Sequence, residues 1–226
     1  MIFRATKTLI GRVAAIFLAI VLSSAAIAQE EIPEIPLVDI KSVDPTIVIE
    51  LRYAGTNNVT GRPLYPRGTR AMVRPEVAQR LAVAQAFFRK RKHGLKIWDA
   101  YRPPSVQLEL WQAAGNNDYV ADPETINGSL HGWGIAVDAT LVDSHKRERP
   151  MPTDFDDFTP AAMWRYQGAD PGIRANLIFL QAGMRKAGFY GLKREWWHFI
   201  VPNWQDYVPD KDIHFGAHKK LPEPNL

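Results

Sequence analysis

Two segments of the chain have the apolar spacing of amphipathic helices. In the segments 74–93 and 170–187, apolar residues recur every three or four positions and therefore fall on one face. Pro75 and Pro171 stand where the first turn of a helix tolerates proline, and a third, shorter helix is predicted over 105–114. A glycine follows each segment, so the pattern predicts three helices with defined ends.

Four other segments are rich in β-branched or aromatic residues and predict strands. Between the first strand and the first helix, residues 54–70 are rich in Gly, Asn and Pro and predict a long loop. Helices and strands mix without the regular rhythm of βαβ units, which favours an α+β fold in one domain. The predicted strands are 46–53, 95–98, 135–142 and 195–201.

The N-terminus has the pattern of a secretory signal peptide. Three basic residues precede an apolar core at Val13–Leu22, and Ala26-Ile27-Ala28 supplies small residues at a cleavage site. This core is short for a membrane span, which needs about 20 residues, and an uncleaved membrane anchor is the alternative. We therefore expect a signal peptide over residues 1–28, cleavage after Ala28 and export, to the periplasm.

The rest of the chain divides into two predicted parts. Residues 29–45 include Pro33 and Pro36 and predict a linker, and residues 46–226 form the functional domain. In the 226-residue chain, 46% of the residues are apolar and 23% are charged, as in ordinary globular proteins.

The apparent basicity of the chain belongs largely to its export signal. Loss of Arg4, Lys7 and Arg12 with the signal peptide lowers the formal net charge from +4 to +1. The long basic run at 89–92 ends a predicted helix, where cations interact favourably with the helix dipole. We therefore expect no nucleic-acid partner, which would require a basic surface, and no membrane partner once the signal is removed.

Two histidines and an aspartate in unusual settings indicate a metal site. The chain has no cysteine, so a metal would be bound by histidines and carboxylates. Asp138 lies in an apolar strand, His198 lies in an aromatic run, and His131 precedes Asp138 by seven positions. Because an odd offset puts two residues on opposite faces of a regular strand, we expect a bend at Gly132 and Gly134. The two histidines and Asp138 then suit a catalytic zinc ion.

Two charged residues are candidates for the remaining chemistry. Glu195, three positions before His198, could take a proton from a metal-bound water. Arg102 follows a predicted strand and could face a developing oxyanion, with Asp99 holding its guanidinium. Ordinary structural interpretations stay open: hydrogen-bonded core histidines, a paired aspartate, surface charge for Glu195 beside Arg194, and a plain ion pair between Arg102 and Asp99.

Four motifs together span most of the chain behind the signal: Ser-x-His-x-x-Gly-x-Ala-x-Asp at 129–138, Glu-x-x-His at 195–198, Asp-Ala-Tyr-Arg-Pro at 99–103 and Tyr-Ala-Gly-Thr-Asn-Asn-Val-Thr-Gly at 53–61. They resemble the motifs of the zinc D,D-peptidases. This family includes VanX-type D-alanyl-D-alanine dipeptidases and VanY-type carboxypeptidases, and the motif at 53–61 is similar to the dipeptidase branch. The resemblance implies a small antiparallel sheet flanked by helices, the hedgehog/D,D-peptidase-like fold.

The resemblance implies a role for each candidate residue. One zinc ion per chain would be bound by His131, Asp138 and His198. Glu195 would be the general base, and Arg102 would stabilise the tetrahedral oxyanion. The implied reaction is hydrolysis of the dipeptide D-alanyl-D-alanine to two molecules of D-alanine.

The resemblance also implies the residues of the pocket. Asp156 would receive the free ammonium of the substrate, and Asp154 and Asp157 are near enough in sequence to be confused with it. Tyr53 and Ser129 would line the small pocket. Because a site for a free dipeptide needs a closed wall, we expect the long loop after Tyr53 to supply that wall.

The sequence departs from the best-known family members in two ways. Val59 stands where an aromatic residue is usual, which would loosen the pocket, and the export signal is unlike the cytoplasmic resistance enzymes. We therefore expect a role in cell-wall peptide turnover or salvage. Two alternatives stay open: a zinc carboxypeptidase that trims peptidoglycan stem peptides, and a non-catalytic wall-binding module on the same fold. The sequence pattern indicates no particular oligomeric state.

Overall fold

The computed structural model describes residues 35–208 of the chain, apart from 116–118 and 124–127. The predicted signal peptide, residues 1–28, lies outside the described residues. Among the described residues, no helix is both long enough and apolar enough to cross a membrane.

The central sheet has five strands in the order β2-β4-β5-β7-β6. Its middle is the antiparallel pair β4 (His93–Asp99) and β5 (Ala136–Asp143). β7 (His198–Ile200) and β6 (Tyr190–Gly191) extend the sheet antiparallel on the far side of β5. Nearly every residue of β4 and β5 is buried, which means that both faces of these strands are covered and explains their continuous apolar character.

The edge strand β2 (Val48–Ile49) departs from the antiparallel sheet that the resemblance implied, because it pairs parallel with β4. After β2 the chain passes through β3 (Met72–Val73) and α2 (Pro75–Arg89) before it enters β4. A crossover through a helix joins strands that run in the same direction. β2 is also shorter than predicted, because the chain turns after Ile49 and a 3-10 turn at Arg52–Ala54 follows, in which Tyr53 is buried.

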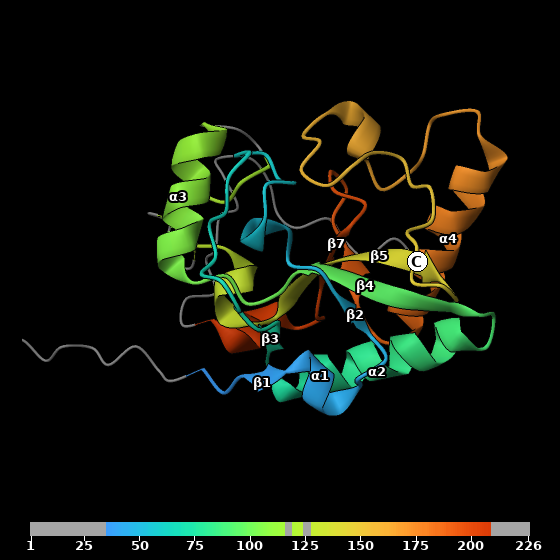
Figure 1. Ribbon diagram of the computed structural model, residues 1–226, viewed down its shortest axis with the longest axis horizontal. Coiled ribbons are helices and arrows are strands. Elements are labelled where there is room, and N and C mark those ends of the chain that lie inside the picture. Colours follow the sequence, from blue (N-terminus) through green and yellow to red (C-terminus); the bar gives the residue numbers. More distant parts are fainter. Residues whose placement is uncertain (1–34, 116–118, 124–127, 209–226) are drawn as a thin grey trace, which may run out of the picture. The chain divides into compact units, whose positions relative to one another are not determined.

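Helices pack beside the central sheet. α2 packs against β4 and against α4 (Pro171–Lys186), which itself packs against β5 and β6. Figure 1 shows α2 below the strands and α3 (Pro104–Ala114) to the upper left of them. Asp170 caps α4, as predicted, by accepting hydrogen bonds from the N–H groups of Gly172 and Ile173. The described elements belong to one compact unit of mixed helix and sheet, which confirms the predicted α+β class.

α2 ends earlier than the sequence pattern indicated. It stops at Arg89, Lys92 adopts a left-handed conformation with a φ of 58°, and β4 already begins at His93. Phe88 is the last residue of α2 that is fully buried, and the four cations after it offer no apolar face to pack. Tertiary packing rather than local propensity therefore determines where this helix ends.

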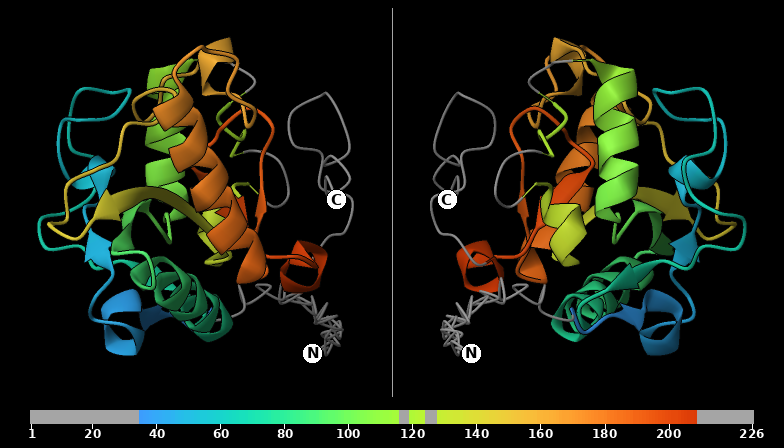
Figure 2. Two further views of the ribbon diagram at one scale, coloured as in Figure 1. Left: turned by 90° about the vertical axis from the view of Figure 1, so that its right-hand side faces the viewer. Right: turned by 90° about the vertical axis from the view of Figure 1, so that its left-hand side faces the viewer.

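Residues that the sequence pattern assigned to a linker are part of the fold. β1 (Val38–Asp39) pairs antiparallel with β3, and the short helix α1 (Ile40–Val43) packs beside α2, as Figure 2 shows. Asp39 caps α1 by accepting the N–H of Lys41, and Ile40 is completely buried. The prediction of a linker through residue 45 is wrong for this part, because burial of Ile40 outweighs the local signal of two prolines.

We expect Ile40→Ala to lower the free energy of unfolding by about 2–4 kcal/mol, since it removes three buried carbon atoms from the core. Ile178 on α4 provides a matched control, because its side chain is 58% exposed. Ile178→Ala should change the free energy of unfolding by less than about 0.5 kcal/mol. Urea denaturation measures both, and equal values for the two variants would contradict a core position for α1.

Candidate metal centre

The register of the sheet brings three functional side chains into one row. Asp138 on β5 lies opposite Asp99 on β4 and opposite His198 on β7. Side chains of directly opposed residues lie on the same face of a sheet. The pairing with Asp99 depends on a shift of register in β4 between Ile97 and Asp99. Without this irregularity Trp98 would oppose Asp138, and Asp99 would point to the other face.

His131 reaches the same face from a 3-10 turn, Leu130–Trp133, that precedes β5. The expected bend is present at Gly134, which has a φ of 68° and where a Cβ atom would lie only 2.6 Å from Leu37. His131 Nδ1 donates a hydrogen bond to the carbonyl oxygen of Ala100 at 2.7 Å. This bond determines the tautomer and leaves Nε2 free to act as a ligand atom.

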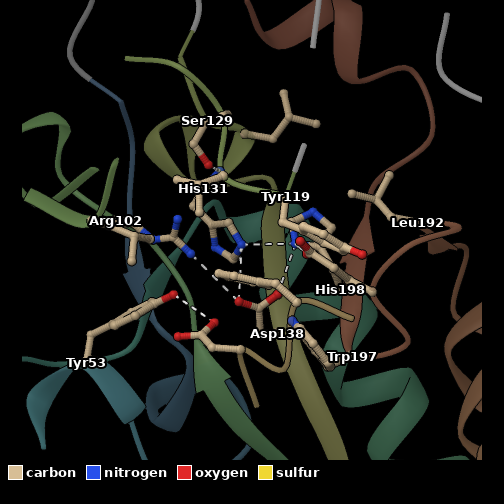
Figure 3. A pocket seen from close by; sticks show the side chains of 16 residues that line it. Tyr53, Arg102, Tyr119, Ser129, His131, Asp138, Leu192, Trp197 and His198 are labelled. Atoms are coloured by element: carbon tan, nitrogen blue, oxygen red, sulfur yellow. Dashed lines mark hydrogen bonds and ion pairs between the residues drawn. The ribbon is translucent and has the colours of Figure 1, made fainter. Parts of the chain in front are cut away.

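Three potential ligand atoms converge between β5, β7 and this turn. His198 Nδ1 lies 3.2 Å from His131 Nε2 and 3.0 Å from Asp138 Oδ1, and His131 Nε2 lies 3.5 Å from Asp138 Oδ2. All three side chains are buried, and their ligand atoms lie within 4.8 Å of one another. Figure 3 shows the three side chains pointing toward one another. Such a group could hold a metal ion.

The protonation states of this group suit a metal ligand set. Burial raises the pKa of Asp138, but the imidazoles of His131 and His198 outweigh burial and hold the pKa below its ordinary value. Burial also lowers the pKa of His198, which favours the neutral imidazole. An ionised carboxylate and a neutral imidazole are the forms that bind metals, so the residues present fit a divalent cation.

Glu195 lies in a turn just before β7 rather than in the strand predicted from the aromatic run. The N–H of His198 donates to the carbonyl oxygen of Glu195 at 3.2 Å. In a regular strand, residues three apart point to opposite faces, whereas this turn brings Glu195 Oε2 to 3.7 Å from His198 Nδ1. Glu195 is only 8% exposed and lines the pocket, so its interpretation as surface charge is wrong. Burial and the nearby carboxylates of Asp138 and Asp156 raise the pKa of Glu195 well above its ordinary value.

Arg102 forms the ion pair with Asp99 that its sequence allowed. Its Nε and Nη2 donate to Asp99 Oδ2 at 2.9 and 2.7 Å, and the hydroxyl of Tyr65 donates to the other oxygen of Asp99. The guanidinium lies over the ring of Tyr53, 4.9 Å from its centroid, and Nη2 lies 3.8 Å from Asp138 Oδ2. A buried ion pair therefore holds Arg102 in the wall of the pocket.

Asp156 is the acid of its segment that reaches the pocket. The hydroxyl of Tyr53 donates to Asp156 Oδ1 at 3.1 Å, and the N–H of Val59 donates to Oδ2 at 3.0 Å. Burial raises the pKa of Asp156 to about 7. Asp154 is exposed, Asp157 is half-buried, and neither lines the pocket, so the structure separates the three acids that the sequence left together.

Ser129 also lines the pocket, and it caps the turn that carries His131. Its Oγ accepts the N–H of His131 at 3.3 Å. A hydroxyl at this position therefore orients a candidate metal ligand as well as facing the pocket.

Much of the apolar pocket wall comes from residues outside the four sequence motifs. The loop 54–70 was expected to supply it, but among the described residues that line the pocket none belongs to that loop. The loop instead supports Asp156 through the backbone of Val59, whose side chain is 40% exposed and outside the pocket lining. The apolar part of the wall consists of Leu110, Tyr119, Val120, Ala121, Leu130, Phe158, Leu192 and Trp197.

Comparisons with known proteins include a family model that spans every residue of this pocket. A family model described as Peptidase M15, D-Ala-D-Ala dipeptidase, matches residues 34–217. A D-alanyl-D-alanine dipeptidase of Escherichia coli (strain K12) is 34% identical over 171 residues, which cover 76% of this chain and 87% of that protein. Proteins of the same name from Enterococcus faecium and Enterococcus faecalis are 25% and 26% identical; the matches cover 67% and 74% of this chain and 84% and 91% of those proteins.

Asp156→Asn should stabilise the metal-free protein at pH 8. The pKa of Asp156 is about 7 in the fold against an ordinary 3.8, so the folded state binds the proton more tightly and stability falls as pH rises from about 4 to 7. Asparagine can accept the Val59 N–H and donate to Tyr53 without carrying a charge. We expect a gain of roughly 2–4 kcal/mol at pH 8 and little gain at pH 4.5, measured by denaturation with chelator present.

Asp157→Asn is the matched control for this substitution, because Asp157 is the next residue along the chain and lies outside the pocket lining. It should change stability little at either pH. A gain for Asp156→Asn that did not grow with pH would contradict the buried-carboxyl interpretation.

Proposed function

Because this chain belongs to the Peptidase M15 family of D-Ala-D-Ala dipeptidases, we propose that it hydrolyses D-alanyl-D-alanine to two molecules of D-alanine. The observation that carries the proposal is the convergence of three buried ligand atoms within 4.8 Å of one another beside a buried glutamate. Hydrolysis of an amide requires a polarised carbonyl, an activated water and a carrier for its proton. Residues suited to each task meet in this pocket.

The proposed metal is one zinc ion per chain, with His131, Asp138 and His198 as its ligands. Two imidazoles and a carboxylate suit catalytic zinc and leave a coordination position for water. The hydrogen bond from His131 Nδ1 to Ala100 supports this assignment, because bonds of this kind orient metal-binding histidines. When bound, zinc lowers the pKa of a coordinated water to about 7 and polarises a carbonyl oxygen.

Glu195 is proposed as the general base. Its carboxyl group lies next to His198, a proposed ligand. In this position Glu195 can take a proton from the attacking water and pass it to the leaving amine. Arg102 is proposed to stabilise the oxyanion that develops on the scissile carbonyl. The contact with Asp99 supports this role, since a guanidinium that is already in position needs no reorganisation during the reaction.

The proposed substrate is a free dipeptide because the pocket offers a carboxylate to the amino end. An ammonium group next to Asp156 would form a charge-assisted hydrogen bond. A stem peptide would present a neutral amide at that point and leave the buried carboxyl of Asp156 without a cation. Tyr53 and Ser129 lie in the lining of the pocket. We propose that they surround the small alanine side chains of the substrate.

We also propose that the protein is exported to the periplasm and acts in turnover or salvage of cell-wall peptides. The basic start, the apolar core and the small residues before Gln29 support export. An exported dipeptidase would act on wall-derived fragments rather than on cytoplasmic precursors.

The purified protein should release D-alanine from D-Ala-D-Ala in the presence of zinc, and a chelator should abolish the activity until zinc is restored. For N-acetyl-D-Ala-D-Ala and for a stem pentapeptide, kcat/KM should be at least about 100-fold lower, because neither offers an ammonium at the right distance. Faster cleavage of the pentapeptide would favour the carboxypeptidase alternative. Zinc binding without cleavage of any of the three would favour the non-catalytic alternative.

Glu195→Gln should retain one equivalent of metal and lower kcat by about 10²- to 10⁴-fold, because the amide cannot accept the proton of the attacking water. His198→Ala, three residues along the chain, should lose the metal instead. Metal analysis and steady-state kinetics on both variants separate the two roles. An active Glu195→Gln variant, or a His198→Ala variant that keeps its metal with unchanged affinity, would contradict the corresponding assignment.

A further inference from the structure

Gln107 is a buried polar side chain at the pocket that none of the sequence motifs explains. It lies on α3 and is 3% exposed. Its Oε1 accepts a hydrogen bond from Arg102 Nη1 at 2.8 Å, and its Nε2 donates to the carbonyl oxygen of Ala121 at 2.6 Å. A guanidinium can only donate and a carbonyl oxygen can only accept, so these partners determine which way the amide points.

The first contact completes the restraint of Arg102. Asp99 accepts hydrogen bonds from Nε and Nη2, and Gln107 accepts one from Nη1. All three guanidinium nitrogens therefore have a buried partner. Removal of Gln107 would leave Nη1 without this acceptor. The guanidinium could then rotate about the side-chain bonds of Arg102, and its positive charge would no longer face the oxyanion.

The second contact reaches the wall of the pocket. Tyr119, Val120 and Ala121 all line it, and the ring of Tyr119 stacks on Phe158 with the centroids 5.1 Å apart. The carbonyl group that Gln107 holds therefore belongs to a segment that faces the substrate. One amide side chain joins this wall segment, residues 119–121, to the guanidinium of Arg102.

We propose that Gln107 is a positioning residue that holds Arg102 and the wall segment 119–121 in a fixed relation, so that its two hydrogen bonds affect different kinetic constants. The bond to Arg102 supports kcat, and the bond to Ala121 supports KM. This inference rests on the proposed function, in which Arg102 stabilises the oxyanion. Glutamine suits the position because a primary amide offers an acceptor and a donor at one end of a side chain.

Two substitutions separate the two bonds. Gln107→Leu removes both, whereas Gln107→Glu keeps an acceptor for Arg102 and loses the donor to Ala121. Gln85 on α2 supplies the matched control. It is also 3% exposed, accepts the N–H of Leu95 at 2.7 Å and donates to Thr46 Oγ1 at 3.0 Å, and it lies outside the pocket lining.

With D-Ala-D-Ala and saturating zinc, Gln107→Leu should lower kcat by about 10- to 100-fold, as expected when a charge at the reacting centre is misplaced. Gln107→Glu should keep kcat within about threefold of the original protein and raise KM by about fivefold or more, because only the wall segment is released. Gln85→Leu should lower Tm as much as Gln107→Leu and leave kcat and KM within about twofold.

Three results would overturn the inference: an unchanged kcat in Gln107→Leu, an equal loss of kcat in Gln85→Leu, or a folded Gln107→Glu variant that loses as much kcat as Gln107→Leu. If Gln107→Leu does not fold, the kcat and KM of Gln107→Glu decide the question.

A readout without substrate keeps this test independent of the proposed function. In ¹⁵N NMR, the guanidinium of Arg102 should rotate slowly in the unaltered protein and in Gln107→Glu, and faster in Gln107→Leu. Equal rotation in all three proteins contradicts the inference even if D-Ala-D-Ala is not the substrate. Absence of D-Ala-D-Ala cleavage by the unaltered protein contradicts the proposed function alone.

Discussion

A carboxylate can be buried in the middle of a sheet only where neighbouring groups compensate its charge, and Asp138 imposes that condition on this fold. It lies on the central strand β5, with one neighbouring strand on each side. His198 comes from β7, His131 comes from the turn before β5, and Arg102 follows β4. The segments that carry the candidate catalytic and ligand residues therefore converge around the carboxylate of Asp138.

Arg102, which lies beside Asp138, is itself buried and is compensated by a second set of polar groups. Asp99 and Gln107 hold Arg102, while Tyr65 donates to Asp99. Each buried polar group in this network satisfies the next, which restricts the positions that Arg102 can take.

Two carboxyl groups of the pocket, Asp156 and Glu195, lower the stability of the folded protein when they are ionised. Burial raises the pKa values of Asp156 and Glu195, so the fold disfavours the ionised form of both. Perturbed carboxyl groups of this kind gather at functional sites, because a group that serves a substrate cannot already be neutralised by the protein. Aromatic packing among Trp98, Phe155 and Trp197 beside these acids removes water from the region and strengthens their interactions.

The sequence by itself indicated the three long helices and singled out the charged residues and histidines of the candidate site. The helix over 171–186 carries its own signals, namely an N-cap, a proline in the first turn and one apolar face, and such signals act over a few residues. Likewise, a carboxylate in an apolar strand and a histidine in an aromatic run are conspicuous without any tertiary information. His131, Asp138 and His198 could therefore be singled out from residue type and setting.

Only the tertiary structure decided which groups meet. The parallel pairing of β2, the incorporation of Ile40 into the core and the register shift that sets Asp99 against Asp138 all depend on contacts between distant segments. A turn that brings Glu195 beside His198 also replaced part of a predicted strand. The pocket wall and Gln107 carry no local signal, because a buried amide is defined by the partners that the fold supplies. Local sequence patterns can identify a charged or polar residue, but tertiary packing determines which groups form its hydrogen bonds and ion pairs.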